Sequence, residues 1–165
     1  MTLMNQLKHW LMRLHLLRLG AWAYELYRLV RRPDTHGALV AIWWRQQLLM
    51  VKTSYRRGYG LPGGGLRRSE TPAQAAVREL REELGLTLQG SWLRQPWTLT
   101  EHRAGGCNTV TIFSLMWPPT SDHTDQPPEL MPDRLEILET VWMTLEQAQQ
   151  QKLPEHLQRY LLDQG

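Results

Sequence analysis

The sequence predicts an α/β fold that follows a separate basic helix. Between residues 33 and 165, apolar segments rich in β-branched residues occur among segments of helical composition. One run, from Gly60 to Leu86, reads as a strand end, a glycine loop and a helix in succession. Residues 1–32 instead carry a helical repeat with many basic residues. We therefore expect an N-terminal helix over residues 1–32 and a domain over residues 33–165.

Length and composition fit one globular domain. The chain has 165 residues, of which 42% are apolar, and this is enough for a proper core. Its net charge is only +3, which gives no argument for nucleic-acid binding, and we expect none. Cys107 is the single cysteine, so an internal disulfide and a cysteine-based zinc site are excluded. A reducing, cytoplasmic location fits this cysteine usage.

Residues 1–32 form a basic amphipathic segment. Apolar residues recur at alternating spacings of four and three: Leu3, Leu7, Trp10, Leu14, Leu17, Ala21 and Tyr24. Three interpretations stay open: a helix packed on the domain or on a second subunit of a homodimer, a helix on an anionic membrane surface, and a targeting segment. Arg13 and Arg18 argue against the targeting segment, because they interrupt any signal-peptide core. The recurring charges exclude a transmembrane span.

Signals for the other elements follow in order through the domain. Pro33 to Gly37 breaks the helical pattern and marks the boundary. The expected strands are Ala38–Trp44, Leu48–Thr53, Ser91–Leu93, Trp97–Thr100, Thr109–Trp117 and Leu135–Trp142. A polar turn at Arg45–Gln47 joins the first two strands. Two short helices close the chain, one capped by Thr144 and one starting at Pro154. Pro118–Pro132 is a long loop, and loops of this length are often functional or disordered.

The glycine loop and the helix behind it carry the clearest local signals. Gly63–Gly65 leave the backbone free to adopt positive φ and to approach other groups closely. Residues 73–84 are strong helix formers. The boundary signals are Thr71 as N-cap, Pro72 at the first helical position, Gln74 for a capping box and Gly85 just past the C-terminus. The helix is therefore predicted with both of its ends.

Three carboxylates cluster on this helix. The face to be buried comprises Ala73, Ala76, Val77, Leu80 and Leu84. Glu79, Glu82 and Glu83 follow the spacing i, i+3, i+4 and so lie together on an adjoining face. Taken alone, this pattern also fits an ordinary acidic helix face. A divalent cation among the carboxylates would offset their repulsion, since Mg²⁺ and Mn²⁺ prefer carboxylate oxygen. A pair between Arg78 and Glu70 would hold the loop against the helix.

The whole run resembles the Nudix box, with Gly64, Glu70 and the segment 78–86 at its defined positions. The resemblance covers about residues 36–145 and implies an α/β/α sandwich around a mixed central sheet. It also implies roles for the box residues: metal ligands for Glu79, Glu82 and Glu83, a structural pair for Arg78 and Glu70, and the turn of the loop for Gly64, with Gly85 ending the helix. The family often has an acidic residue near Arg67, where this chain is basic.

The resemblance further implies hydrolysis of a nucleoside diphosphate linked to another moiety, with Mg²⁺ or Mn²⁺ as cofactor. Bound metal neutralises phosphate charge and lowers the pKa of a water that attacks phosphorus in line. In this family a further acid often comes from a later segment. Glu136 is the first candidate and Glu139 the second, because both lie in a segment similar to the family's E-x-x-E-x-x-W. Glu101, Asp122 and Asp125 stay open as well.

The loop Ser54–Gly60 is expected to contact the substrate, because the segment before the box often helps to form the substrate cleft in this family. Arg57 is the phosphate candidate, and Tyr55 or Tyr59 the base-stacking candidate. Arg67 and Arg68 would add positive potential for an anionic substrate.

Two alternatives remain open to an enzyme that acts on a nucleoside diphosphate derivative. One is a nucleoside triphosphate pyrophosphohydrolase. The other is a non-catalytic module that binds a nucleotide on the same fold, motivated by the basic N-terminal helix. Three crowded carboxylates argue against a pure binder, because binding alone does not need them.

Overall fold

The computed structural model describes residues 34–103, 106–119 and 126–164. Its elements in chain order are β1 (Thr35–Trp44), β2 (Gln47–Thr53), β3 (Gly63–Gly65), α2 (Pro72–Leu84), η1 (Gly90–Trp92), β4 (Arg94–Arg103), β5 (Gly106–Met116), β6 (Ile137–Thr144), α3 (Leu145–Gln149) and α4 (Glu155–Leu162). The predicted N-terminal helix and the candidates Asp122 and Asp125 lie outside the described residues. Among the helices that are described, none has the length and apolarity needed to cross a membrane.

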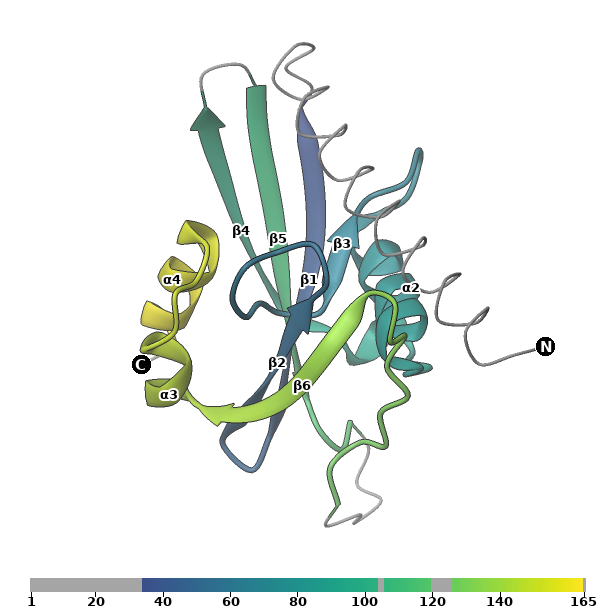
Figure 1. Ribbon diagram of the computed structural model, residues 1–165. Coiled ribbons are helices and arrows are strands. Elements are labelled where there is room, and N and C mark those ends of the chain that lie inside the picture. The colour runs from purple at the N-terminus through teal and green to yellow at the C-terminus, as the bar shows by residue number, and fades with distance from the viewer. Residues whose placement is uncertain (1–33, 104–105, 120–125, 165) are drawn as a thin grey trace, which may run out of the picture.

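The described strands form one mixed sheet, in the order β4-β5-β1-β2-β6. β1 runs parallel to β5, whereas the pairs β1–β2, β2–β6 and β4–β5 are antiparallel. The short β3 pairs antiparallel with the first half of β1, through Gly63 opposite Leu39. β1 thus lies at the centre of the sheet and holds the glycine segment beside it (Figure 1).

Helices cover both faces of this sheet: α2 lies on one side, and α3 and α4 lie on the other (Figure 1). Alternating residues of β1 divide between the two faces, because side chains in a strand point to opposite sides. Val40 and Ile42 join the α2-side cluster, whereas Leu39 and Ala41 join the cluster that contains residues of α4. Strands buried on both faces read as unbroken apolar runs, as in this chain. The α/β/α sandwich with a mixed sheet is therefore confirmed.

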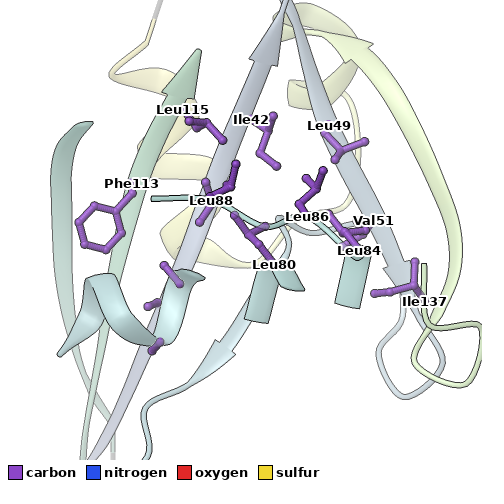
Figure 2. Packing of buried hydrophobic residues seen from close by; sticks show 14 residues of the cluster. Ile42, Leu49, Val51, Leu80, Leu84, Leu86, Leu88, Phe113, Leu115 and Ile137 are labelled. Atoms are coloured by element: carbon purple, nitrogen blue, oxygen red, sulfur yellow. The ribbon is translucent and has the colours of Figure 1, made fainter. Parts of the chain in front are cut away.

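The α2-side cluster fixes the helix that carries the acidic residues. Figure 2 shows Leu80 and Leu84 of α2, with Leu86 beyond its end, gathered with Ile42 and Leu49 of the sheet. Leu80 and Leu84 are fully buried. The predicted apolar face is thus largely correct, but its centre is rotated: Ala75 is buried, while Ala73 and Val77 are only half-buried. Glu83 is buried as well, which the pattern did not indicate.

Most predicted elements are present, and one is wrong. The expected strand at Ser91–Leu93 is the single 3₁₀ turn η1, and β4 begins only at Arg94. Two local hydrogen bonds form the turn: the Trp92 N–H donates to the Gln89 carbonyl, and the Leu93 N–H donates to the Gly90 carbonyl. Trp92 and Leu93 pack against the α2-side cluster, so their apolar character reflects core contact and not a strand.

The hairpin between β1 and β2 has a two-residue turn at Arg45 and Gln46, with φ of 45° and 64°. Two positive φ values match the twist of the flanking strands in a tight hairpin. The predicted turn is confirmed, except that Gln47 already belongs to β2.

Candidate active site

The first part of the site is the glycine segment β3. Gly63 has φ of 128°, and a Cβ there would lie 2.2 Å from the carbonyl oxygen of Ala38. Only glycine therefore allows β3 to pair with β1 at this point. The pairing aims the Gly63 N–H at the carboxylate of Glu83, whose Oε2 accepts it at 2.7 Å. The backbone of β3 thus contacts the helix directly.

Gly64 is required for a different reason than its predicted one. The sequence predicts that it gives the loop its turn, but the positive φ values lie at Gly63 and Ser69. A Cβ on Gly64 would lie 2.6 Å from Oε1 of Glu79. The missing side chain at Gly64 leaves the space that the Glu79 carboxylate occupies.

Helix α2 has the ends that the sequence predicts. The hydroxyl of Thr71 accepts the N–H of Gln74, and the Gln74 side chain accepts the N–H of Thr71, which is a complete capping box. Gly85 follows the last turn in the left-handed conformation, with φ of 69°. The C-terminal turn is also fixed from outside, because Asp133 N–H donates to the carbonyl of Glu83.

Arg78 connects the loop to the helix. Its Nε and Nη2 donate to the two carboxylate oxygens of Glu70 at 2.8 and 2.9 Å, and Nη2 also donates to the Gly65 carbonyl at 2.9 Å. Its Nη1 donates to Glu79 at 2.6 Å and to Glu82 at 3.1 Å. The Arg78 guanidinium and the backbone N–H of Arg67 lower the pKa of Glu70 to about 2. The loop is thus held by a side chain that is only 11% exposed.

Glu83 is the buried member of the acidic cluster, with 2% of its surface exposed. Its pKa is raised to about 7: burial and the nearby charges of Glu79 and Glu136 raise it, whereas the Gly63 N–H bond and Arg56 lower it. Within the described part of the chain Glu83 forms no ion pair, and Arg56 acts on it only through its charge. Its environment therefore favours either a proton or a cation.

Glu136 joins the cluster from a distant part of the chain. Its carbonyl accepts the N–H of Ser54, and its own N–H donates to the Asp133 carbonyl, so the segment before β6 lies beside the end of β2. Burial raises the pKa of Glu136, and the charges of Asp133, Glu79 and Glu82 contribute. The structure thus brings the first candidate acid to the box residues.

The other candidate acids lie elsewhere. Glu139 accepts the hydroxyl of Tyr59 at 3.0 Å, and Tyr59 packs with the cluster on the α3–α4 side of the sheet. Glu101 lies 3.5 Å from Nδ1 of His156 in α4. Both carboxylates therefore belong to the face opposite α2.

The structure separates the two base-stacking candidates of the loop 54–60, Tyr55 and Tyr59. Burial raises the pKa of Tyr55, with contributions from Glu83, Glu136 and Glu79, so its phenol lies near the acidic cluster. The guanidinium of Arg56 lies 5.5 Å from the centre of the Tyr55 ring and lowers the pKa of Glu83. Tyr59 faces the other side of the sheet. Arg56 and Arg57 are adjacent arginines, so no sequence signal could distinguish them.

The carboxylate oxygens of Glu79, Glu82 and Glu83 are suitable ligands for a divalent cation, but each carboxylate accepts hydrogen bonds from different groups in this structure. Among the described residues, no three acidic, histidine or cysteine side chains converge on one point. Glu79 accepts from Arg78, Glu82 from Arg67 and Arg78, and Glu83 from a backbone N–H. All of these are hard oxygen donors, and the raised pKa values of Glu83 and Glu136 reflect their burial first and the neighbouring carboxylates second. Glu79, Glu82 and Glu83 are the residues that would hold Mg²⁺ or Mn²⁺, and their carboxylates would have to turn toward one another to do so.

Comparison with known proteins adds three findings. The family profile described as NUDIX domain matches residues 34–164. A 40-residue stretch, 24% of this chain and 24% of the relative, is 48% identical to an RNA pyrophosphohydrolase of Hydrogenovibrio crunogenus, so the match spans about a quarter of that relative. Among solved structures, a MutT protein from Methanosarcina mazei Go1 superimposes with a TM-score of 0.64 at 16% identity, covering 79% of this chain and 92% of that one.

A second solved structure contains a metal ion. It is a bifunctional NMN adenylyltransferase/ADP ribose pyrophosphatase from Francisella tularensis in complex with AMP and a Mn ion. The similarity covers 88% of this chain and 47% of that one, with a TM-score of 0.63 at 22% identity. At such identities, both solved structures establish the fold.

Proposed function

Since the chain belongs to the NUDIX-domain family, we propose that it is a divalent-metal-dependent hydrolase that cleaves a pyrophosphate bond in a nucleoside diphosphate derivative by attack of water on phosphorus. The observation that carries the proposal is that the charges of four carboxylates, Glu79, Glu82, Glu83 and Glu136, act on one another, with Glu83 held by the Gly63 N–H and Glu79 beside Gly64. Crowded carboxylates cost free energy without a cation, so their presence supports a metal-binding role.

In this proposal Glu79, Glu82 and Glu83 hold Mg²⁺ or Mn²⁺. The bound metal supplies charge neutralisation for the phosphates and lowers the pKa of a coordinated water. Glu136 accepts the proton of the attacking water, because its raised pKa brings it closer to neutrality, where a general base is most effective. Arg78 positions Glu79 and Glu82 through its Nη1 and is itself fixed by Glu70.

Arg56, in place of Arg57, is proposed to bind a phosphate, and Tyr55, one of the two candidates from the sequence, is proposed to orient it. The support is the stacking of the Arg56 guanidinium on the Tyr55 ring at the edge of the acidic cluster. Replacing Arg56 with Ala should raise KM more than the same change at Arg57. A larger effect at Arg57 would restore the assignment made from the sequence.

A second substrate class, a triphosphate end on a nucleotide or an RNA, is favoured by one observation. The 40-residue match is to a protein named RNA pyrophosphohydrolase. This class departs from our expectation that no nucleic acid is involved, so the substrate panel must include it. A purely binding role is disfavoured by the intact acidic cluster.

The test is a phosphate-release screen with Mg²⁺ and with Mn²⁺. The panel covers nucleoside diphosphate sugars, dinucleotides, dinucleoside polyphosphates, nucleoside triphosphates and 5′-triphosphorylated RNA. Glu82→Gln and Glu83→Gln should each reduce kcat by orders of magnitude while the fold is kept, whereas Glu146→Gln, on the exposed surface of α3, should match the wild type. Turnover at the wild-type rate in either box variant would refute the metal site. A wild-type protein that binds Mn²⁺ without any turnover would favour the binding module.

The role of residues 1–32 and the cytoplasmic location stay predictions. Deleting residues 1–30 distinguishes the interpretations of the segment. A truncated protein that stays folded and active but no longer binds anionic vesicles would support membrane contact. Loss of folding would support packing on the domain, and a change from dimer to monomer would support a subunit contact.

A further inference from the structure

We propose that Arg67 competes with the divalent cation for Glu82 and thereby sets the metal affinity of the site. The guanidinium Nη2 of Arg67 lies 3.1 Å from Oε1 and 3.2 Å from Oε2 of Glu82. A metal bound to Glu82 would use one or both of these oxygens. Because the guanidinium lies against both oxygens and offsets their negative charge, a cation binds Glu82 more weakly while this ion pair is in place.

Arg67 is suited to release its partner. Its side chain is 64% exposed, and within the described part of the chain Glu82 is its one hydrogen-bond acceptor. Its backbone is fixed independently of the side chain, because the Arg67 N–H donates to Glu70 at 2.8 Å. The guanidinium can therefore leave Glu82 for water while the loop keeps its position.

Arg78 cannot exchange in the same way, although it also contacts Glu82. Its side chain is only 11% exposed and donates to Glu70, Gly65 and Glu79 besides Glu82. Removal of Arg78 would disconnect the loop from the helix. Arg78 thus stabilises the loop, whereas the side chain of Arg67, among the described residues, pairs only with Glu82, the proposed metal ligand.

An exposed ion pair is a weak competitor, which sets the size of the effect. Such pairs contribute little to stability in water, because both charges are well solvated. We therefore expect Arg67→Ala to tighten Mn²⁺ binding by about two- to fivefold, with the melting temperature of the metal-free protein unchanged. This inference rests on the proposed function only in that it assumes Glu82 as a metal ligand.

The experiment is a titration of the full chain with Mn²⁺ in which free Mn²⁺ is followed by electron paramagnetic resonance. Arg68→Ala is the matched control, because it removes the same charge from the next residue, which makes no ion pair among the described residues. A lower Kd in Arg67→Ala than in Arg68→Ala and the wild type is the expected result. Equal Kd values in the two variants would overturn the proposal, since a general charge effect would then be sufficient.

A double-mutant cycle with Glu82→Gln tests whether Arg67 acts through Glu82. The gain from Arg67→Ala should vanish in the Glu82→Gln background, and a gain that persists there would refute the competition. Absence of Mn²⁺ binding in the wild type would instead contradict the proposed function. The two failures are therefore distinguishable.

Discussion

Substituting Gly64 with Ala separates the geometry of the site from the stability of the fold. The added methyl would lie 2.6 Å from Oε1 and 2.8 Å from Cδ of Glu79. These atoms form the end of a flexible side chain, so the carboxylate moves and the backbone of β3 stays. The change therefore displaces a proposed metal ligand without altering it chemically.

The cost in stability follows from what Glu79 loses. Its hydrogen bond to Arg78, at 2.6 Å between groups that are 14% and 11% exposed, is charge-assisted and contributes about 1.5–3 kcal/mol. A Gly→Ala change without strain stabilises by about 0.4–1 kcal/mol, because the unfolded chain loses freedom. The net destabilisation is therefore about 1–2 kcal/mol. The loss in kcat should be larger, about a hundredfold, since a small displacement of a catalytic group can cost that much.

The two neighbouring glycines supply the controls. A Cβ on Gly65 would meet only the His36 carbonyl oxygen, at 3.9 Å, so Gly65→Ala should be neutral or slightly stabilising and fully active. Gly63→Ala meets backbone at 2.2 Å and has φ of 128°, so it should lose at least about 3 kcal/mol. Urea denaturation gives the free energies of unfolding, and steady-state kinetics give kcat. If Gly64→Ala behaves like Gly65→Ala in both assays, the argument about space for Glu79 is wrong.

Three further predictions concern stability. Leu80→Ala should cost about 2–5 kcal/mol in urea denaturation, because Leu80 is fully buried between α2 and the sheet, whereas Arg81→Ala on the exposed side should change little; equal costs would contradict the packing. Thr71→Ala should cost about 1 kcal/mol through loss of the capping box, and Thr71→Ser should restore most of it. Glu70 has a pKa of about 2 in the folded protein, against 4.5 for a free side chain. Its ionised form therefore stabilises the fold above pH 4.5. This contribution is lost as the pH falls toward 2. Glu70→Gln should flatten this part of the stability–pH curve, and an unchanged curve would refute the assigned pair.

Local signals fixed the helix of the site well. Thr71, Gln74 and Gly85 specify where α2 begins and ends through hydrogen bonds within a few residues, and the structure contains those bonds. The spacing of Glu79, Glu82 and Glu83 likewise places them together on any helix, whatever surrounds it. The pairing of Arg78 with Glu70 required only that the loop return to the helix that follows it.

Long-range features depended on the fold. The burial of Glu83 and the space that Gly64 leaves for the Glu79 carboxylate could not be predicted from the sequence pattern. Both follow from the position of β3 between β1 and α2. Glu136 became a candidate acid only through resemblance to a family, and its position beside Ser54 comes from the pairing of β2 with β6. The choice between Tyr55 and Tyr59 depended on the fold, because Tyr59 packs on the α3–α4 side of the sheet whereas Tyr55 lies near the acidic cluster.

The amino-acid sequence by itself determined the α/β class, the glycine loop, the helix and its three carboxylates, because these follow from backbone preferences and periodicity over short distances. The tertiary structure decided which of the distant candidates lie near those carboxylates: Tyr55 and its neighbour Arg56 from one loop, and Glu136 from the segment before β6. The physical reason is that the sheet register, fixed by burial on both faces, sets these distances, and no local pattern encodes the register.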